Sequence, residues 1–245
     1  MTTNEALIVV DYQNGFIPEH ASGVNELPVE GGELLAPVIN QLMRETRTRG
    51  GLVIATRDWH PRGHMSLARN YIGKNPFDTI TYNEVTNAKK HTPRLGEEAE
   101  FSLEDLQVEL GAGMGPQVLW PDHCIADTPG AEYFRGLDTD LIDHHIIKGD
   151  DPKTEMYSGF FGREMRQDDT VVRVTDILRD AGVEVVKIVG LATDFCVQST
   201  AVDAVKNGFK TMIDKRAIAG VMVKSPEDTV AYLQKLRDEK GVEYI

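Results

Sequence analysis

The chain has 245 residues, of which 41% are hydrophobic and 27% are charged, a balance that argues against a fibrous or largely disordered protein. Asp and Glu outnumber Lys and Arg by 39 to 26, so the formal net charge is −13, which repels phosphate backbones and argues against nucleic-acid binding. No apolar run approaches the roughly 20 residues of a membrane span, and we expect no secretory signal because the N-terminal residues carry no basic segment.

Short apolar runs predict buried strands, and amphipathic segments between them predict helices. In chain order these are a strand at 6–10, a helix at 32–49, a strand at 52–55, a weak helix at 102–110, a short strand at 146–147, a helix at 171–181, a strand at 185–189, a helix at 195–207, a strand at 209–213 and a helix at 226–240. Strands that are apolar throughout and alternate with helices are typical of a parallel sheet covered on both faces. We therefore predict an open α/β architecture with right-handed crossovers.

The segment 61–116 interrupts this pattern. It holds clusters of Gly, Pro, Asn and Thr and only the weak helix. A stretch of this length is too long for an ordinary connection between elements, so we expect a functional insertion or a lid.

Four reactive side chains follow four of the predicted strands, namely Asp11, Asp58, Lys148 and Cys196. In an open parallel sheet, ligands bind beyond the carboxyl ends of the strands. Taken one at a time, Asp11 also fits an ordinary turn, Lys148 a solvated surface lysine and Cys196 a buried core cysteine. Their joint position at one edge favours a functional site.

Cys196 is the candidate nucleophile. It is expected in the first turn of a helix, which Thr193 or Asp194 can cap, and the positive helix end there lowers the pKa of a thiol. Lys148 would favour the thiolate further, and Asp11 could exchange its proton. The free N–H groups of the same turn could form an oxyanion hole.

A second cluster contains candidate metal ligands. Asp58 and His60 are two residues apart and share one side of an extended segment, and His64 lies four residues further on. His123 is distant in the sequence. Carboxylate and imidazole ligands suit zinc, iron or manganese. Solvated loop histidines are the alternative interpretation.

Six blocks of the sequence together resemble the nicotinamidases, which are isochorismatase-like cysteine hydrolases. The resemblance covers most of the chain from about residue 5 to 221, and the long insertion is most similar to the fungal-type enzymes. The blocks are DYQNGF at 11–16, TRDWHPRGHMS at 56–66, LWPDHC at 119–124, KG at 148–149, YSGF at 157–160 and GLATDFCVQSTAVDA at 190–204.

The resemblance implies a fold and a reaction. The fold is a Rossmann-like, open parallel six-stranded sheet with helices on both faces, in a single domain spanning 1–245 with an insertion at about 66–117. The reaction is hydrolysis of nicotinamide to nicotinate and ammonia through a thioester intermediate, a step of NAD salvage. We expect a cytoplasmic location, because the only two cysteines, Cys124 and Cys196, make a disulfide framework unlikely.

The resemblance also assigns roles to residues. Cys196 would be the nucleophile, Asp11 its proton acceptor and Lys148 the third member of the triad. A divalent metal would be held by Asp58, His60 and His123, with His64 a ligand in some members only. The N–H groups of Ala192 and Cys196 would form an oxyanion hole. Phe16, Trp120 and Tyr157 would line a substrate pocket. Zinc is the first choice of metal, with iron and manganese as alternatives.

We expect Phe16 and Trp120 to serve substrate binding more than folding, because both lie in predicted loops beyond strand ends. For Tyr157, plain core packing is nearly as good an interpretation. Two other functions stay open: hydrolysis of a different small amide on the same fold, and a non-catalytic metal-binding module. The expected partner is the small-molecule substrate, with no nucleic acid and no membrane, and a homo-oligomer is left open.

Overall fold

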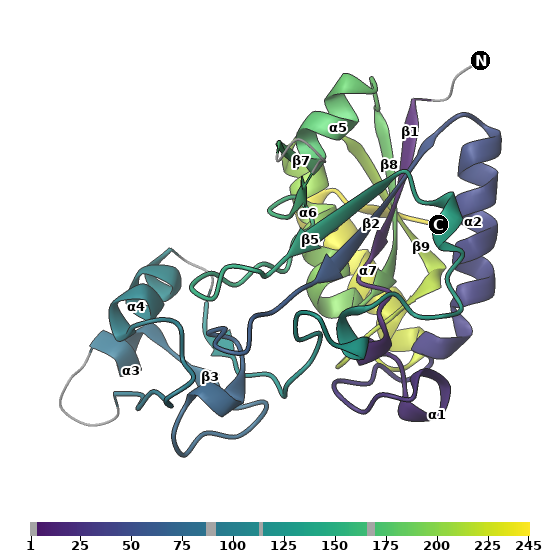
Figure 1. The fold of residues 1–245 in the computed structure, drawn as a ribbon. Coiled ribbons are helices and arrows are strands. Elements are labelled where there is room, and N and C mark those ends of the chain that lie inside the picture. Colours follow the sequence, from purple (N-terminus) through teal and green to yellow (C-terminus); the bar gives the residue numbers. More distant parts are fainter. Residues whose placement is uncertain (1–3, 87–91, 113–114, 166–169) are drawn as a thin grey trace.

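The computed structural model describes residues 4–86, 92–112, 115–165 and 170–245. Its centre is an eight-stranded sheet with the strand order β10-β9-β8-β1-β2-β5-β6-β7 (Figure 1). The strands are β1 (Glu5–Val10), β2 (Leu52–Asp58), β5 (His144–Lys148), β6 (Arg163–Met165), β7 (Val171–Arg173), β8 (Val185–Leu191), β9 (Lys210–Ala219) and β10 (Glu243–Tyr244). A separate antiparallel pair joins β3 (Thr79–Ile80) to β4 (Gln117–Val118).

The predicted α/β class is confirmed, but the predicted number of six strands is wrong. Six neighbouring strands, from β10 to β5, do pair in parallel. The short strands β6 and β7 extend this sheet by antiparallel pairing at one edge. These edge strands have only three residues each, too few to show a recognisable pattern of buried positions.

Helices cover both faces of the sheet. One face is covered by α2 (Ala36–Thr48), and the other by α5 (Val174–Asp180), α6 (Gln198–Lys206) and α7 (Pro226–Lys240). The other helices of the described residues are α1 (Glu19–Ser22), α3 (Tyr82–Thr86) and α4 (Leu103–Gly111). Short 3₁₀ turns occur at Asn14–Phe16, Gly32–Leu34, Ala68–Asn70, Pro129–Ala131 and Thr139–Leu141, and a π-helical turn at Thr193–Val197 leads into α6. Among the described residues, no helix is both long enough and apolar enough to cross a bilayer.

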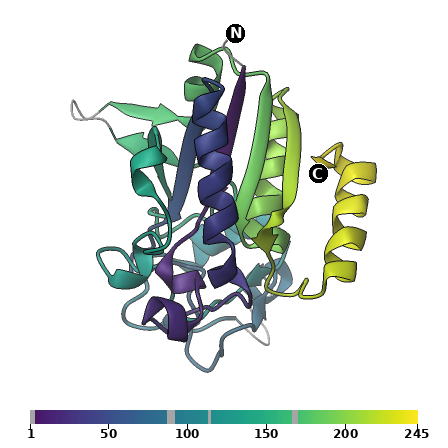
Figure 2. The same ribbon diagram turned by 90° about the vertical axis from the view of Figure 1, so that its right-hand side faces the viewer.

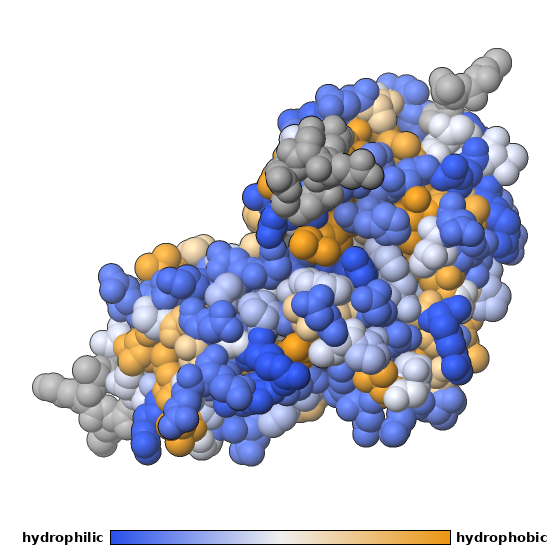
Figure 3. Space-filling view, viewed as in Figure 1, coloured by the Kyte–Doolittle hydropathy of each residue, from blue (hydrophilic) through white to orange (hydrophobic). Residues whose placement is uncertain are grey.

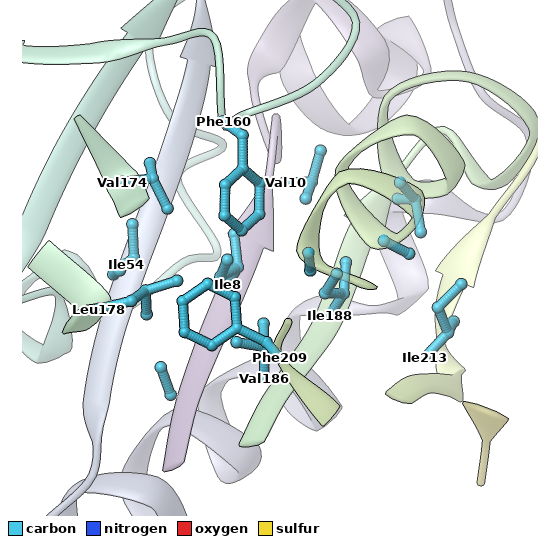
Figure 4. Close-up of a cluster of buried hydrophobic side chains, with 14 of the residues drawn as sticks. Ile8, Val10, Ile54, Phe160, Val174, Leu178, Val186, Ile188, Phe209 and Ile213 are labelled. Carbon is cyan, nitrogen blue, oxygen red and sulfur yellow. The ribbon is translucent and has the colours of Figure 1, made fainter. Parts of the chain in front are cut away.

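The alternation of side chains along β1 explains why its buried residues 6–10 are all apolar. Leu7 and Val9 belong to the core cluster that α2 covers (Figure 2). Ile8 and Val10 point to the opposite face and belong to the cluster that α5, α6 and α7 cover (Figure 4). Because successive residues of a strand face opposite sides, a strand buried on both faces must be apolar throughout.

Three predicted helices differ from the structure at their N-terminal ends. The segment predicted as a helix at 171–181 begins with strand β7, because its β-branched pair Val171–Val172 extends the sheet edge before α5 starts at Val174. The segment predicted at 195–207 begins two residues earlier, at Thr193, with the π-helical turn. In the predicted helix at 32–49, Leu34 lies in a 3₁₀ turn and is 71% exposed rather than buried.

The insertion forms a lobe that projects from the body of the molecule (Figures 1 and 3). It contains α3, α4 and the β3–β4 pair, and it has a small core of its own. Met65, Tyr71, Ile80, Leu106 and Leu119 are among the buried members of this core. The predicted weak helix is α4, whose first turn is capped by Ser102 in a capping box with Asp105.

We predict that the stability of the lobe depends on Leu106, which is fully buried in α4. Leu106→Ala should cost about 2–5 kcal/mol of unfolding free energy, since it leaves a cavity in a small core. The matched control is Val108→Ala in the same helix. Val108 is 69% exposed, so its loss should change stability by no more than about 0.5 kcal/mol. Denaturant unfolding of both variants measures the difference, and equal effects would contradict the packing of α4.

Candidate active site

The four predicted reactive side chains meet beyond the carboxyl ends of four neighbouring strands. Asp11 follows β1, Asp58 and Lys148 end β2 and β5, and Cys196 lies in the turn after β8. Asp58 and Lys148 are direct partners in the β2–β5 ladder, so strand register alone places them side by side. All four side chains are buried.

The Lys148 ammonium group lies at the centre of this cluster and has no exposed surface. Its Nζ is 2.9 Å from Asp11 Oδ2 and also donates to Asp58 Oδ1. It lies 3.3 Å from Cys196 Sγ and donates to the Met156 carbonyl at 3.0 Å. Although burial opposes the charged form, the carboxylates of Asp11 and Asp58 raise the pKa of Lys148 well above its usual value. Lys148 is therefore a permanent cation.

Asp11 is placed to act as a base. Burial raises its pKa to about 6, against the opposing effect of Lys148. The Thr56 hydroxyl donates to its Oδ1 at 2.6 Å, and the Asp11 backbone N–H donates to the same hydroxyl oxygen at 3.1 Å. This pair of bonds holds the carboxylate in one orientation. At neutral pH the group is ionised yet close to the pKa that suits proton exchange.

The expected lowering of the Cys196 pKa is not observed. Burial raises the pKa of this thiol well above its usual value, and although Lys148 lowers it, Asp11 and Asp58 raise it further. The thiol is therefore protonated in the free protein, and its sulfur lies within 4.8 Å of a carboxylate oxygen of Asp11. Asp194 does not cap the helix either, because its carboxylate accepts the backbone N–H groups of 221–223 instead.

Asp58, His60 and His123 present ligand atoms that lie within 4.8 Å of one another. Each residue is held by a second contact. The Nδ1 of His60 contacts the Gly149 carbonyl at 2.9 Å, and the Nδ1 of His123 contacts the Pro121 carbonyl at 2.8 Å. Because a carbonyl only accepts, both Nδ1 atoms carry the proton, and both Nε2 atoms are free to bind a metal. Two imidazoles and one carboxylate are a fitting donor set for a divalent ion such as zinc.

His64 lies beside this group but differs from it. Its ring centre is 4.4 Å from that of His60. Both of its ring nitrogens are engaged within the protein: Nε2 contacts the Thr154 carbonyl at 3.1 Å, and Nδ1 contacts the Ser66 hydroxyl at 2.8 Å. A metal bond from His64 would have to replace one of these contacts.

The proposed nucleophile and the proposed metal ligands line one cavity. Its empty volume is about 390 Å³ including its open mouth, and its wall includes Asp58, His60, His123, Cys196 and Ala192. The predicted pocket residues Phe16, Trp120 and Tyr157 line it as well. The Phe16 ring packs on His123 at 5.4 Å between centroids, and the Trp120 Nε1–H donates to the Tyr157 hydroxyl at 3.2 Å.

Phe16 and Trp120 are almost fully buried, at 6% and 5% exposure. Both belong to the core cluster that α2 covers, and Trp120 packs edge-on against Phe195 at 4.8 Å. The expectation that these rings serve binding more than folding is therefore too narrow, because they also form part of the core.

Several residues that line or support the cavity were not predicted from the sequence. Leu27, Glu155, Met156, Phe195 and Val221 line the cavity, and Thr56 and Gln13 support it from behind. Gln13 accepts the Asp58 N–H and donates to the Asp58 carbonyl, both at 2.8 Å. The position of Thr56 could have been predicted from the sequence, because it is two residues before Asp58 in a strand and so faces the same side.

Comparison with known proteins supports a single family. Residues 5–241 match the family model described as the isochorismatase domain. A nicotinamidase from Acinetobacter baylyi is 37% identical over 210 residues, which is 86% of this chain and 78% of that protein. The structure of a Pyrococcus horikoshii pyrazinamidase in complex with zinc has a TM-score of 0.65 and 32% identity, covering 99% of this chain and 98% of that one. The yeast nicotinamidase bound to the inhibitor nicotinaldehyde has a TM-score of 0.72 and 26% identity, covering 98% and 99%.

We predict that the protein binds one equivalent of zinc and that His64 is dispensable for this stoichiometry. His60→Ala or His123→Ala should abolish tight binding, because each removes one of three ligands. His64→Ala should retain one equivalent, because both ring nitrogens of His64 are already engaged within the protein. Elemental analysis after dialysis measures the metal content. A metal-free His64→Ala protein that is still folded would show that His64 is a ligand.

Proposed function

The chain belongs to the isochorismatase family, and on this premise we propose that it hydrolyses nicotinamide to nicotinate and ammonia. The similarity to curated nicotinamidases supports this substrate, and the family supports a hydrolase that acts on an amide. One observation carries the proposal for the site: Cys196 lines the same small cavity as Asp58, His60 and His123, and the buried Lys148 and Asp11 lie beside its sulfur.

The first half of the reaction forms a thioester on Cys196. The thiol proton passes to Asp11 as the sulfur attacks the carboxamide carbon. Because the thiol pKa is well above that of Asp11, the thiolate does not accumulate before substrate is present. The N–H groups of Ala192 and Cys196 stabilise the oxyanion of the tetrahedral intermediate. Asp11 then returns the proton to the amide nitrogen, the C–N bond breaks, and ammonia leaves.

The second half returns the enzyme to its starting state. Asp11 takes a proton from a water molecule, whose oxygen attacks the thioester carbon. The C–S bond then breaks, Cys196 recovers its proton from Asp11, and nicotinate is released. Lys148 remains protonated throughout and stabilises the ionised forms of both partners.

Asp58, His60 and His123 would hold a divalent metal, and we propose zinc. When bound, the ion supplies a Lewis acid that can coordinate the pyridine nitrogen of the substrate. The relative solved in complex with zinc supports this choice of ion. Phe16 and Trp120 supply apolar walls for the flat ring, and the Tyr157 hydroxyl, which accepts from Trp120, fixes the orientation of that wall.

We further propose that residues 1–245 form one hydrolase domain with the insertion at about 66–117 as a lobe of that domain. The match of the family model to 5–241, without a break, supports a single unit. A cytoplasmic location fits this chemistry, because the reducing cytosol keeps the thiol of Cys196 free.

We predict that Cys196→Ala lowers ammonia release from nicotinamide by at least about a thousandfold, because it removes the nucleophile. Cys124→Ser is the matched control. It alters the protein's other buried cysteine and should keep most of the activity. An assay of ammonia release on both variants decides the matter. Activity of Cys196→Ala above about 1% of wild type would remove Cys196 from the proposed role.

A further inference from the structure

Glu26 forms a hydrogen bond that none of the sequence motifs predicts. It lies in the loop between α1 and the 3₁₀ turn at Gly32–Leu34, outside the blocks that carry the resemblance. Its Oε2 accepts the backbone N–H of Cys124 at 2.8 Å, across 98 positions of sequence. Cys124 directly follows His123, one of the proposed metal ligands.

Two glycines make room for the Glu26 carboxylate. A Cβ atom at Gly15 would lie 2.4 Å from its Oε2, and a Cβ at Gly130 would lie 2.1 Å from both of its oxygens. Neither glycine has a positive φ angle, so backbone conformation does not require a glycine at either position. A side chain at either position would instead crowd this carboxylate, and at Gly15 it would also crowd the Cys124 sulfur.

The hydrogen bond between Glu26 and Cys124 also helps to hold an unfavourable backbone conformation. Cys124 has a φ angle of 45°, in the left-handed region that residues with side chains seldom adopt. Such a conformation persists only when its surroundings hold it in place. The Glu26 carboxylate supplies one such contact at the N–H of the strained residue itself, next to the metal-facing side chain of His123.

Glu26 thereby joins three segments that each contribute to the cavity wall. Its neighbour Leu27 lines the cavity and donates its N–H to the Gly15 carbonyl at 2.9 Å. Gly15 precedes Phe16, whose ring packs on His123. The carboxylate thus links the segments that bear Phe16, Leu27 and His123.

We propose that Glu26 is a positioning residue that holds the His123 turn for metal binding. This inference rests on the metal site of the proposed function. It concerns no group that touches the substrate, and it predicts that removal of the Glu26 contact weakens zinc binding while the protein remains folded.

The test is the zinc affinity of the purified full-length protein, measured by competition with a chromophoric chelator. Glu26→Ala should weaken binding by about 10–100-fold, the usual effect of losing a contact that orients a ligand. Glu26→Gln should bind within about threefold of wild type, because its amide oxygen can still accept the Cys124 N–H. Glu30→Ala, which removes an exposed carboxylate from the same loop, should leave the affinity unchanged.

Gly130→Ala tests the same contact from the other side. Its methyl group would displace the carboxylate, so zinc binding should weaken as in Glu26→Ala. The double variant Glu26→Ala/Gly130→Ala should bind no more weakly than Glu26→Ala alone, because the three atoms closest to that methyl group all belong to the Glu26 side chain. If Glu26→Ala does not fold, the zinc affinities of Gly130→Ala and Glu26→Gln are compared instead.

Three results would overturn the inference and are distinguishable from one another. Wild-type protein that binds no zinc would refute the metal site of the proposed function before any variant is measured. Wild-type protein that binds zinc, with Glu26→Ala and Gly130→Ala equally tight, would refute the role of Glu26 alone. A lower melting temperature of metal-free Glu26→Ala with unchanged zinc affinity would show a merely structural role.

Discussion

The buried ammonium group of Lys148 is the interaction on which the site depends. Removing a charge from water costs several kcal/mol unless partners compensate it, and here Asp11, Asp58 and the Cys196 sulfur surround the cation. The same ion holds together two carboxylates that would otherwise repel each other. Asp11 lies beside the proposed nucleophile Cys196, and Asp58 belongs to the proposed metal-ligand group, so one lysine contacts both parts of the candidate site.

The order and register of the strands explain why these four groups lie close together. The strands β8, β1, β2 and β5 are neighbours, and each ends in one of the reactive residues or in the turn that carries it. Register pairs Asp58 with Lys148 directly. The remaining parts of the cavity come from loops: His123 from the segment that follows the insertion, Phe16 from the turn after β1, and Leu27 from the loop that Glu26 ties down.

Much of this arrangement could be predicted from the sequence, because apolar strands and the polar residues that end them are local signals. The class of fold and the positions of Asp11, Asp58 and Lys148 at strand ends needed no long-range information. The edge strands β6 and β7 were missed because three residues show no periodicity. The spacing of His64 resembled that of a ligand, yet Ser66 and Thr154 engage its ring. The direction of the Cys196 pKa was wrong because burial, a tertiary property, outweighs the helix end and the lysine.

A covalent acyl-enzyme on Cys196 is the central claim, and partition of the reaction by hydroxylamine tests it most directly. Hydroxylamine competes with water for a thioester, so nicotinamide turnover in its presence should yield the hydroxamate together with nicotinate. The two acyl products should together equal the ammonia released, and Cys196→Ala should form neither. If ammonia is matched by nicotinate alone at every hydroxylamine concentration, water attacks the amide directly and Cys196 forms no thioester.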